Sequence, residues 1–148
     1  MGLFNILDIS AAGMDVQQAR LEAASLNLAN SNTSTAPGTQ PYRPLEVVIH
    51  SVKSARGVAL PGEMANVAES LPKPVVAQTV PTDAAPRLVY NPGHPDADER
   101  GFVSLPGVDP ISSMLDLISI SRGYEANLRA FDVTRSLLQK TLDLGSRR

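Results

Sequence analysis

Residues 109–145 read DPISSMLDLISISRGYEANLRAFDVTRSLLQKTLDLG and predict one long helix near the C-terminus. Asp109 can cap the first free amides, and Pro110 at the first helical position gives up an N–H that has no partner there. Gly145 is expected to end the helix, as glycine commonly does. At 1.5 Å per residue such a helix extends about 50 Å, far more than a small domain could cover.

This helix carries apolar side chains on two separate faces. A polar stripe, in which Glu125 and Arg129 are spaced for an ion pair, runs between them. On a period of 3.6 residues, one apolar stripe consists of Tyr124, Leu128, Phe131, Leu138 and Leu142, and the other of Ala126, Ala130, Val133, Leu137 and Leu144. Leaving five large apolar side chains in water would forfeit on the order of 10 kcal/mol, comparable to the stability of a domain. The surplus face therefore predicts assembly, although a monomer could fold both terminal helices against each other and against a sheet.

The N-terminal segment shows a weaker form of the same pattern from about Asp8 to Asn30. One face holds Ala12, Val16, Ala19, Ala23 and Leu26, and the opposite face holds Met14, Leu21 and Leu28. The small side chains would let a second helix approach closely. Asn30, which precedes a Ser/Thr/Asn run and Pro37-Gly38, is expected to end this helix. Asn27 is the candidate for a buried amide that sets the register between packed helices.

The middle of the chain differs in composition from both ends. All twelve prolines lie between residues 37 and 110. Leu45–Val52 is the best strand candidate, and weaker strands are predicted at residues 75–80, 87–90 and 102–105. A small open sheet with long loops is expected, with residues 61–74 mobile. The predicted fold class is α+β, with long terminal helices that pair as a coiled coil and a small β-rich, Pro-rich middle.

Composition excludes several classes of function. The 148 residues carry 13 basic and 15 acidic side chains, so there is no electrostatic footprint for nucleic acid. The absence of Cys excludes disulfides, thiolate catalysis and Cys-based metal sites. No run of eighteen apolar residues and no cleavable secretory signal is present, so no membrane insertion is expected.

One cluster of titratable residues has the composition of a metal or acid–base site. His94, Asp96, Asp98 and Glu99 fall within NPGHPDADERG. A Pro-Gly-flanked acidic run is more often a solvated turn, and neither a nucleophile elbow nor a Gly-rich phosphate loop is present. The sequence therefore predicts no active site, no metal and no cofactor. A hydrolase using His94 and Asp96 is the enzymatic alternative.

Several motifs resemble the rod proteins of the bacterial flagellar basal body. Residues 18–21 (QARL) and 25–33 (SLNLANSNT) resemble the S-x-N-L-A-N-x-x-T signature of rod and hook components, and residues 124–127 (YEAN) and 142–145 (LDLG) resemble the C-terminal motif. Residues 88–98 (LVYNPGHPDAD), 101–103 (GFV) and 106–109 (PGVD) resemble the centre of the small proximal-rod proteins of the C type. The stretch from Gly57 to Pro74 departs from that pattern by its length.

The resemblance implies a structural subunit of the proximal rod that transmits torque for motility, with no catalysis. It implies an inner axial domain built from residues 1–36 and 109–148 and a β-rich middle domain at residues 37–108. It also implies export through the flagellar type III apparatus without a cleaved signal peptide, assembly with copies of itself and other rod proteins, and a place in the periplasm-crossing rod. The alternatives are another rod or hook component and a cytoplasmic export-associated binding module.

The residues expected to contact partner subunits lie on the terminal helices. They are Val16, Leu21, Leu26, Asn27, Leu28, Asn30, Tyr124, Asn127, Leu128, Phe131, Val133, Leu137, Leu138, Leu142 and Leu144.

Overall fold

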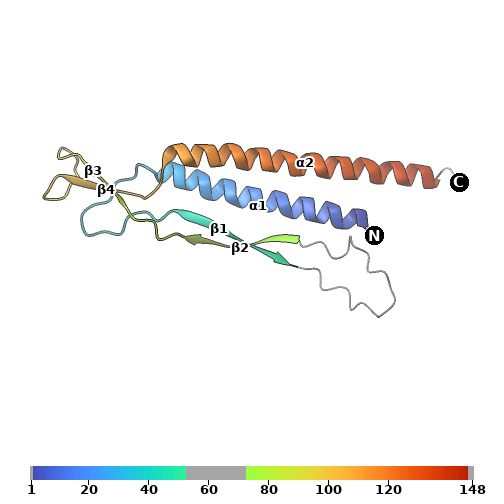
Figure 1. Ribbon diagram of the computed structural model, residues 1–148, viewed down its shortest axis with the longest axis horizontal. Helices are drawn as coiled ribbons and strands as arrows, with labels where there is room; N and C mark the ends of the chain where they lie inside the picture. The colour runs from blue at the N-terminus through green and yellow to red at the C-terminus, as the bar shows by residue number, and fades with distance from the viewer. Residues whose placement is uncertain (1, 53–72, 147–148) are drawn as a thin grey trace. The chain divides into compact units, whose positions relative to one another are not determined.

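A computed structural model describes residues 2–52 and 73–146 (Figure 1). Helix α1 (Gly2–Asn30) is followed by strands β1 (Leu45–Val52), β2 (Lys73–Pro81), β3 (Arg87–Tyr90) and β4 (Phe102–Leu105), and then by helix α2 (Pro110–Ser146). The predicted α+β class is confirmed, as are the bounds of β1, β3 and β4. The second predicted strand, 75–80, extends over 73–81, so residues 73 and 74 belong to a strand. The rest of the segment 61–74 lies outside the described residues.

Each helix differs from expectation at one of its ends. Helix α1 begins at Gly2 instead of near Asp8, because no proline precedes Asp8 to stop it. It ends at Asn30 as predicted, where the amide of Ser31 donates to the Leu28 carbonyl. Helix α2 continues through Gly145 to Ser146, so the prediction that Gly145 ends it was wrong. One glycine costs a helix only about 1 kcal/mol, which is too little to terminate it without further help.

The strands form two separate two-stranded sheets instead of one open sheet. Strand β1 pairs with β2, and β3 pairs antiparallel with β4 in a register that sets Arg87 opposite Leu105 and Tyr90 opposite Phe102. The rings of Tyr90 and Phe102 meet edge to face with centroids 5.4 Å apart. Pro81 is the last residue of β2, and Pro86 directly precedes β3. Because proline has no N–H to donate to a sheet, the first sheet ends at Pro81.

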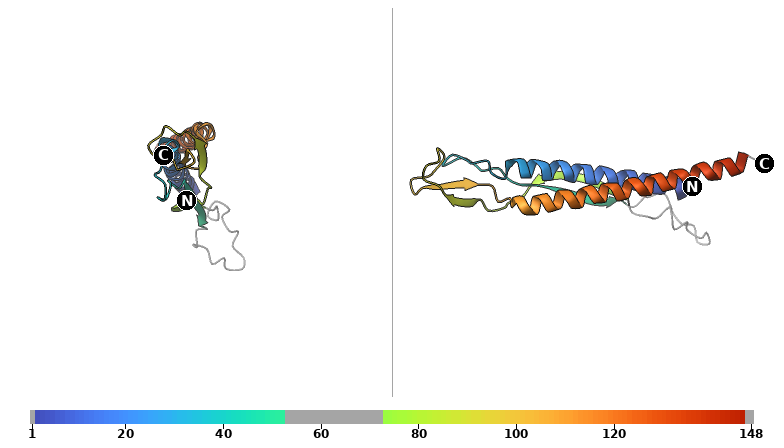
Figure 2. Two further views of the ribbon diagram at one scale, coloured as in Figure 1. Left: turned by 90° about the vertical axis from the view of Figure 1, so that its left-hand side faces the viewer. Right: turned by 90° about the horizontal axis from the view of Figure 1, so that it is seen from above.

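The chain divides into two compact units. The first comprises Met1–Gln18, Ile49–Ala77 and Ser121–Arg148, and the second comprises Ala19–Val48 and Gln78–Ile120. In the described part of each unit, a segment of α1 lies beside a segment of α2 (Figure 1, Figure 2). The buried side chains of the first unit are small, namely Ser10, Ala12, Val16 and Thr134. The second unit buries Ala23, Ser31, Val103, Pro106 and Val108.

The start of α2 is held by Asp109, as the sequence predicted. One carboxylate oxygen accepts from the amide of Ile111 at 3.3 Å, and the other accepts from the Ser112 amide at 3.2 Å and the Ser112 hydroxyl at 2.7 Å. These donors stabilise the charged carboxylate. The hydroxyl of Ser112 first, and then the amides, lower the pKa of Asp109 below its ordinary value.

Replacing Asp109 by Ala is expected to lower the thermal midpoint of unfolding at neutral pH. The stability that comes from a lowered carboxyl pKa is present above the unfolded-state value, about 3.9, and is lost as the pH falls through the folded-state pKa. The gap between wild type and Asp109→Ala should therefore narrow on acidification below about pH 4. Circular-dichroism melts of both chains at pH 7 and in acid measure this gap in the thermal midpoint. The gap between Asp109→Asn and Asp109→Ala, neither of which carries the titrating carboxylate, should not change between the two pH values. A gap between wild type and Asp109→Ala of equal size at both pH values would contradict the assignment.

Candidate assembly interface

One flank of α2 carries apolar side chains through the C-terminal half of the helix. Every member of the predicted second stripe, Ala126, Ala130, Val133, Leu137 and Leu144, is exposed. Leu137 is 49% exposed and Leu144 71% exposed. The polar stripe carries the predicted ion pair between Glu125 and Arg129, whose nitrogen and oxygen lie 3.7 Å apart. In the first unit, α2 therefore turns a complete row of apolar side chains toward water.

The fifteen predicted interface residues fall into two groups. The exposed group consists of Leu21, Leu26, Tyr124, Leu128, Val133, Leu137, Leu142 and Leu144. The buried or half-buried group consists of Val16, Asn27, Leu28, Asn30, Asn127, Phe131 and Leu138. Only the first group is accessible to a partner without rearrangement of this chain.

Sequence reasoning missed one exposed stripe at the start of α2. Ile111, Met114, Leu115 and Ile118 are all more than half exposed, and Ile111 reaches 71%. Their spacing of three and four residues places them on one face of the helix. That spacing is visible in the sequence, so the periodicity could have identified it.

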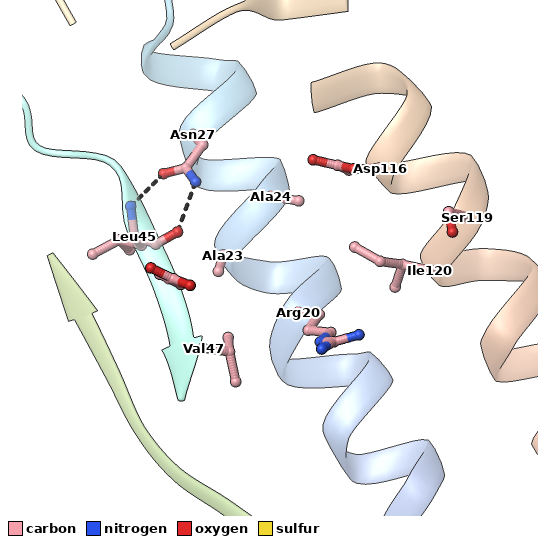
Figure 3. Close-up of a pocket in the computed structure, with 10 residues that line it drawn as sticks. Arg20, Ala23, Ala24, Asn27, Leu45, Val47, Asp116, Ser119 and Ile120 are labelled. Atoms are coloured by element: carbon pink, nitrogen blue, oxygen red, sulfur yellow. Dashed lines mark hydrogen bonds between the residues drawn. The ribbon is translucent and has the colours of Figure 1, made fainter. Parts of the chain in front are cut away.

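Asn27 bonds to a strand, not to a second helix as its predicted role required. Its side-chain oxygen accepts from the Leu45 amide at 2.7 Å, and its side-chain nitrogen donates to the Leu45 carbonyl at 2.9 Å (Figure 3). The Tyr42 hydroxyl also donates to the Asn27 oxygen, at 3.0 Å. Tyr42 is half-buried, and this partial burial raises the pKa of its hydroxyl. The amide of Asn27 thus ties the first residue of β1 to the last turn of α1.

Replacing Asn27 by Ala is expected to lower the free energy of unfolding by about 1–2 kcal/mol, because the amide and carbonyl of Leu45 lose their partner. Urea denaturation of the full chain measures this. Asn32→Ala, an exposed asparagine of the same motif, serves as the control and should change the free energy of unfolding little. Equal effects of the two substitutions would show that the bonds to Leu45 contribute nothing specific.

The register between the helices in the first unit is set by glycines that face amide side chains. A Cβ on Gly13 of α1 would lie 2.8 Å from Nδ2 of Asn127 on α2, and a Cβ on Gly123 of α2 would lie 3.0 Å from Nε2 of Gln17 on α1. Residue numbers rise along one helix as they fall along the other, so the two segments are antiparallel. Asn127 of the YEAN motif therefore packs on Gly13, a position that the sequence analysis did not single out. A glycine inside a helical pattern was the available signal.

A double-mutant cycle tests this contact. Alanine favours a helix over glycine by about 1 kcal/mol, but in the wild-type background that gain should be cancelled by collision with Asn127. In an Asn127→Ala background the space is open, so Gly13→Ala should then raise stability by about 1 kcal/mol. Urea denaturation of the four chains gives the coupling. The same effect of Gly13→Ala in both backgrounds would mean that the helices do not meet in this register.

The acidic cluster within residues 94–99 forms a hydrogen-bonded turn. The Ser34 hydroxyl donates to Asp96, and Nδ1 of His94 accepts from the Asp96 amide at 3.1 Å. One oxygen of Asp98 accepts from the amides of Arg100 and Phe102, which closes the hairpin between β3 and β4. In residues 2–52 and 73–146, no three His, Asp or Glu side chains are grouped as a metal site requires. Neither described helix has both the length and the apolar character needed to cross a membrane.

Comparison with known proteins places these surfaces in context. Residues 99–144 match a family model described as flagellar basal body rod FlgEFG protein C-terminal. The flagellar basal-body rod protein FlgC of Escherichia coli O6:H1 is 39% identical over 145 residues, which cover 98% of this chain and 99% of that protein. FlgC of Aquifex aeolicus is 38% identical over 144 residues, covering 97% of each chain. FlgC of Bacillus subtilis is 34% identical over 149 residues, covering 98% of this chain and 99% of the relative.

Proposed function

Because this chain belongs to the FlgC family of flagellar basal-body rod proteins, we propose that it transmits torque through helices packed against neighbouring subunits. It is a structural subunit of the rod of the flagellar basal body, and it is not an enzyme. Within the rod it assembles with other rod proteins. The proposal adds the proximal position, the contact surfaces and the physical basis of assembly.

The observation that carries the proposal is the distribution of side chains around α2. In the first unit the side of α2 that meets α1 carries Gly123 and Asn127, whereas an adjoining flank carries Val133, Leu137 and Leu144, all of which are exposed. The chain's own helix therefore leaves an apolar flank of α2 uncovered. Fully burying one leucine stabilises by about 1.5–3 kcal/mol, so a partner that covers this row gains more than the small side chains within the unit supply.

The proposed contact surface is the exposed group defined above together with the stripe Ile111, Met114, Leu115 and Ile118. We further propose that residues 1–36 and 109–148 form an inner axial domain in which α1 and α2 pair as a coiled coil, and that residues 37–108 form an outer β-rich domain. The antiparallel contact of Gly13 with Asn127 supports that pairing. Copies of this chain are proposed as neighbours beside other rod proteins.

The proposal also includes the route of export. The chain is exported through the flagellar type III apparatus without a cleaved signal peptide. The small side chains buried in the first unit support it, because a helix pair held by little apolar burial unfolds easily enough to pass a narrow channel.

Deletion of the gene followed by electron microscopy of purified basal bodies tests the function. Cells without the chain are expected to lack a complete rod and to be non-motile, and expression of the wild-type chain should restore both. Intact rods and normal swimming without the chain would overturn the proposal.

A further inference from the structure

The proposed function leaves open what covers the second apolar stripe of α2 in the first unit. We propose that three residues of this stripe, Val133, Leu137 and Leu144, dock together with Lys140 of the same helix face in a groove on the second unit of another copy of the same chain. This inference rests on the proposed assembly of copies through their helices, and it names the surface that receives α2.

The groove lies within the second unit between α1, α2 and β1 (Figure 3). Its volume is about 310 Å³, which suits a few side chains more than a small-molecule ligand. Helix α1 contributes Ala23 and Ala24, whose small side chains leave the space between the elements open. Ile120 of α2 adds an apolar wall. A groove bordered by small side chains can accept a row of larger ones from another helix.

Charged side chains line the same groove. Arg20 lies on α1, Glu46 on β1 and Asp116 on α2. The groove thus carries two carboxylates against one guanidinium. An occupant with apolar side chains and a single positive charge would match this lining in both polarity and charge.

The docking row in the first unit has that composition. Val133, Leu137, Lys140 and Leu144 are spaced by three or four residues and so share one face of α2. All four are exposed. Leu137 and Leu144 can enter the groove, while Lys140 between them can pair with Asp116 or Glu46.

The row and the groove are different surfaces, so the contact is heterologous. Repetition of such a contact gives an open helical array unless a ring closes, which suits a rod. A chain cannot fill its own groove in this way, because 18 residues of α2 separate Ser119, on the groove, from Leu137, on the row. They lie about 27 Å apart along a helix.

Disulfide cross-linking tests the contact directly, because the natural chain has no cysteine. The full chain carrying Ser119→Cys and Leu137→Cys should form disulfide-linked dimers in oxidised, purified basal bodies. An internal disulfide is excluded, since it requires Cα atoms within about 7 Å. The matched control carries Ser119→Cys and Ser136→Cys, because Ser136 is the exposed neighbour of Leu137 on the polar stripe. It should give no dimers, nor should either single-cysteine chain.

Charge reversal supplies a second readout. Lys140→Glu in the first double-cysteine chain should abolish cross-linking, and the addition of Asp116→Lys should restore it. A photo-reactive phenylalanine analogue in place of Ser119 identifies the occupant by mass spectrometry. A peptide from residues 133–146 of this chain supports the proposal, and a peptide from another rod protein overturns it.

Swimming and incorporation separate this inference from the proposed function. If the cysteine variants are incorporated and the cells swim, but dimers are absent or equal in the control, the groove assignment is wrong while the rod function stands. If the wild-type chain itself is absent from basal bodies, the proposed function fails first.

Discussion

Cells in which Leu137 is replaced by Asp are expected to lose swimming and to lack the variant chain in their basal bodies. Leu137 is 49% exposed in the chain, so a carboxylate there costs the isolated subunit little. In the assembled rod the same carboxylate would be buried without a partner, at a cost of several kcal/mol. The loss should therefore concern assembly, not folding, and the helix content of the purified variant should equal that of the wild type.

The matched control is Ser136→Asp, one residue earlier on the polar stripe. That side chain is exposed and points about 100° around the helix from Leu137, so swimming should be preserved. Soft-agar swimming and immunoblots of purified basal bodies measure both effects. Normal swimming by Leu137→Asp would show that this row is not a packed contact in the rod.

Replacing Gly107 by Ala should lower the free energy of unfolding by about 3 kcal/mol, the upper end of the cost of overpacking. A Cβ at this position would collide with the Ala85 carbonyl oxygen and would lie 3.0 Å from the Ala84 Cβ. The carbonyl oxygen of Ala85 belongs to the backbone, so it cannot move away as the end of a flexible side chain can. The neighbouring Pro106 and Val108 are buried, so the segment has little room to shift.

Gly93→Ala is the control in the same unit. Its nearest neighbour would be Oδ1 of Asn91 at 3.9 Å, an ordinary contact, so stability should change by less than about 0.5 kcal/mol. Urea denaturation of both variants compares them with wild type. Similar stability of Gly107→Ala and Gly93→Ala would mean that residues 84–85 and 107 do not approach each other this closely.

Periodicity and local capping made much of the fold predictable from the sequence. The Asp109-Pro110 pair placed the start of α2, the β-branched run placed β1, and the prolines marked the limits of the helices. These signals are local, because each depends on residues within a turn or two of one another. The α+β class and the exposed second stripe of α2 followed from them.

Contacts between distant residues were not predictable in the same way. The sequence around Asn27 contains no signal that its amide bonds to Leu45. A buried asparagine on a helix is equally compatible with a neighbouring helix. Whether Gly13 lies opposite Asn127 depends on the register between α1 and α2. No local sequence pattern specifies that register. Two separate sheets instead of one likewise depend on pairings across the chain.

The bond pair between Asn27 and Leu45 has a further consequence for a protein that works among many related subunits. The open edge of a β-strand is a template on which a foreign strand can add, and crowding of related chains raises that risk. One side chain of α1 engages both backbone groups of Leu45. At this residue, the first of β1, the backbone N–H and C=O are already engaged within the chain and are not offered as a pairing site to a foreign strand.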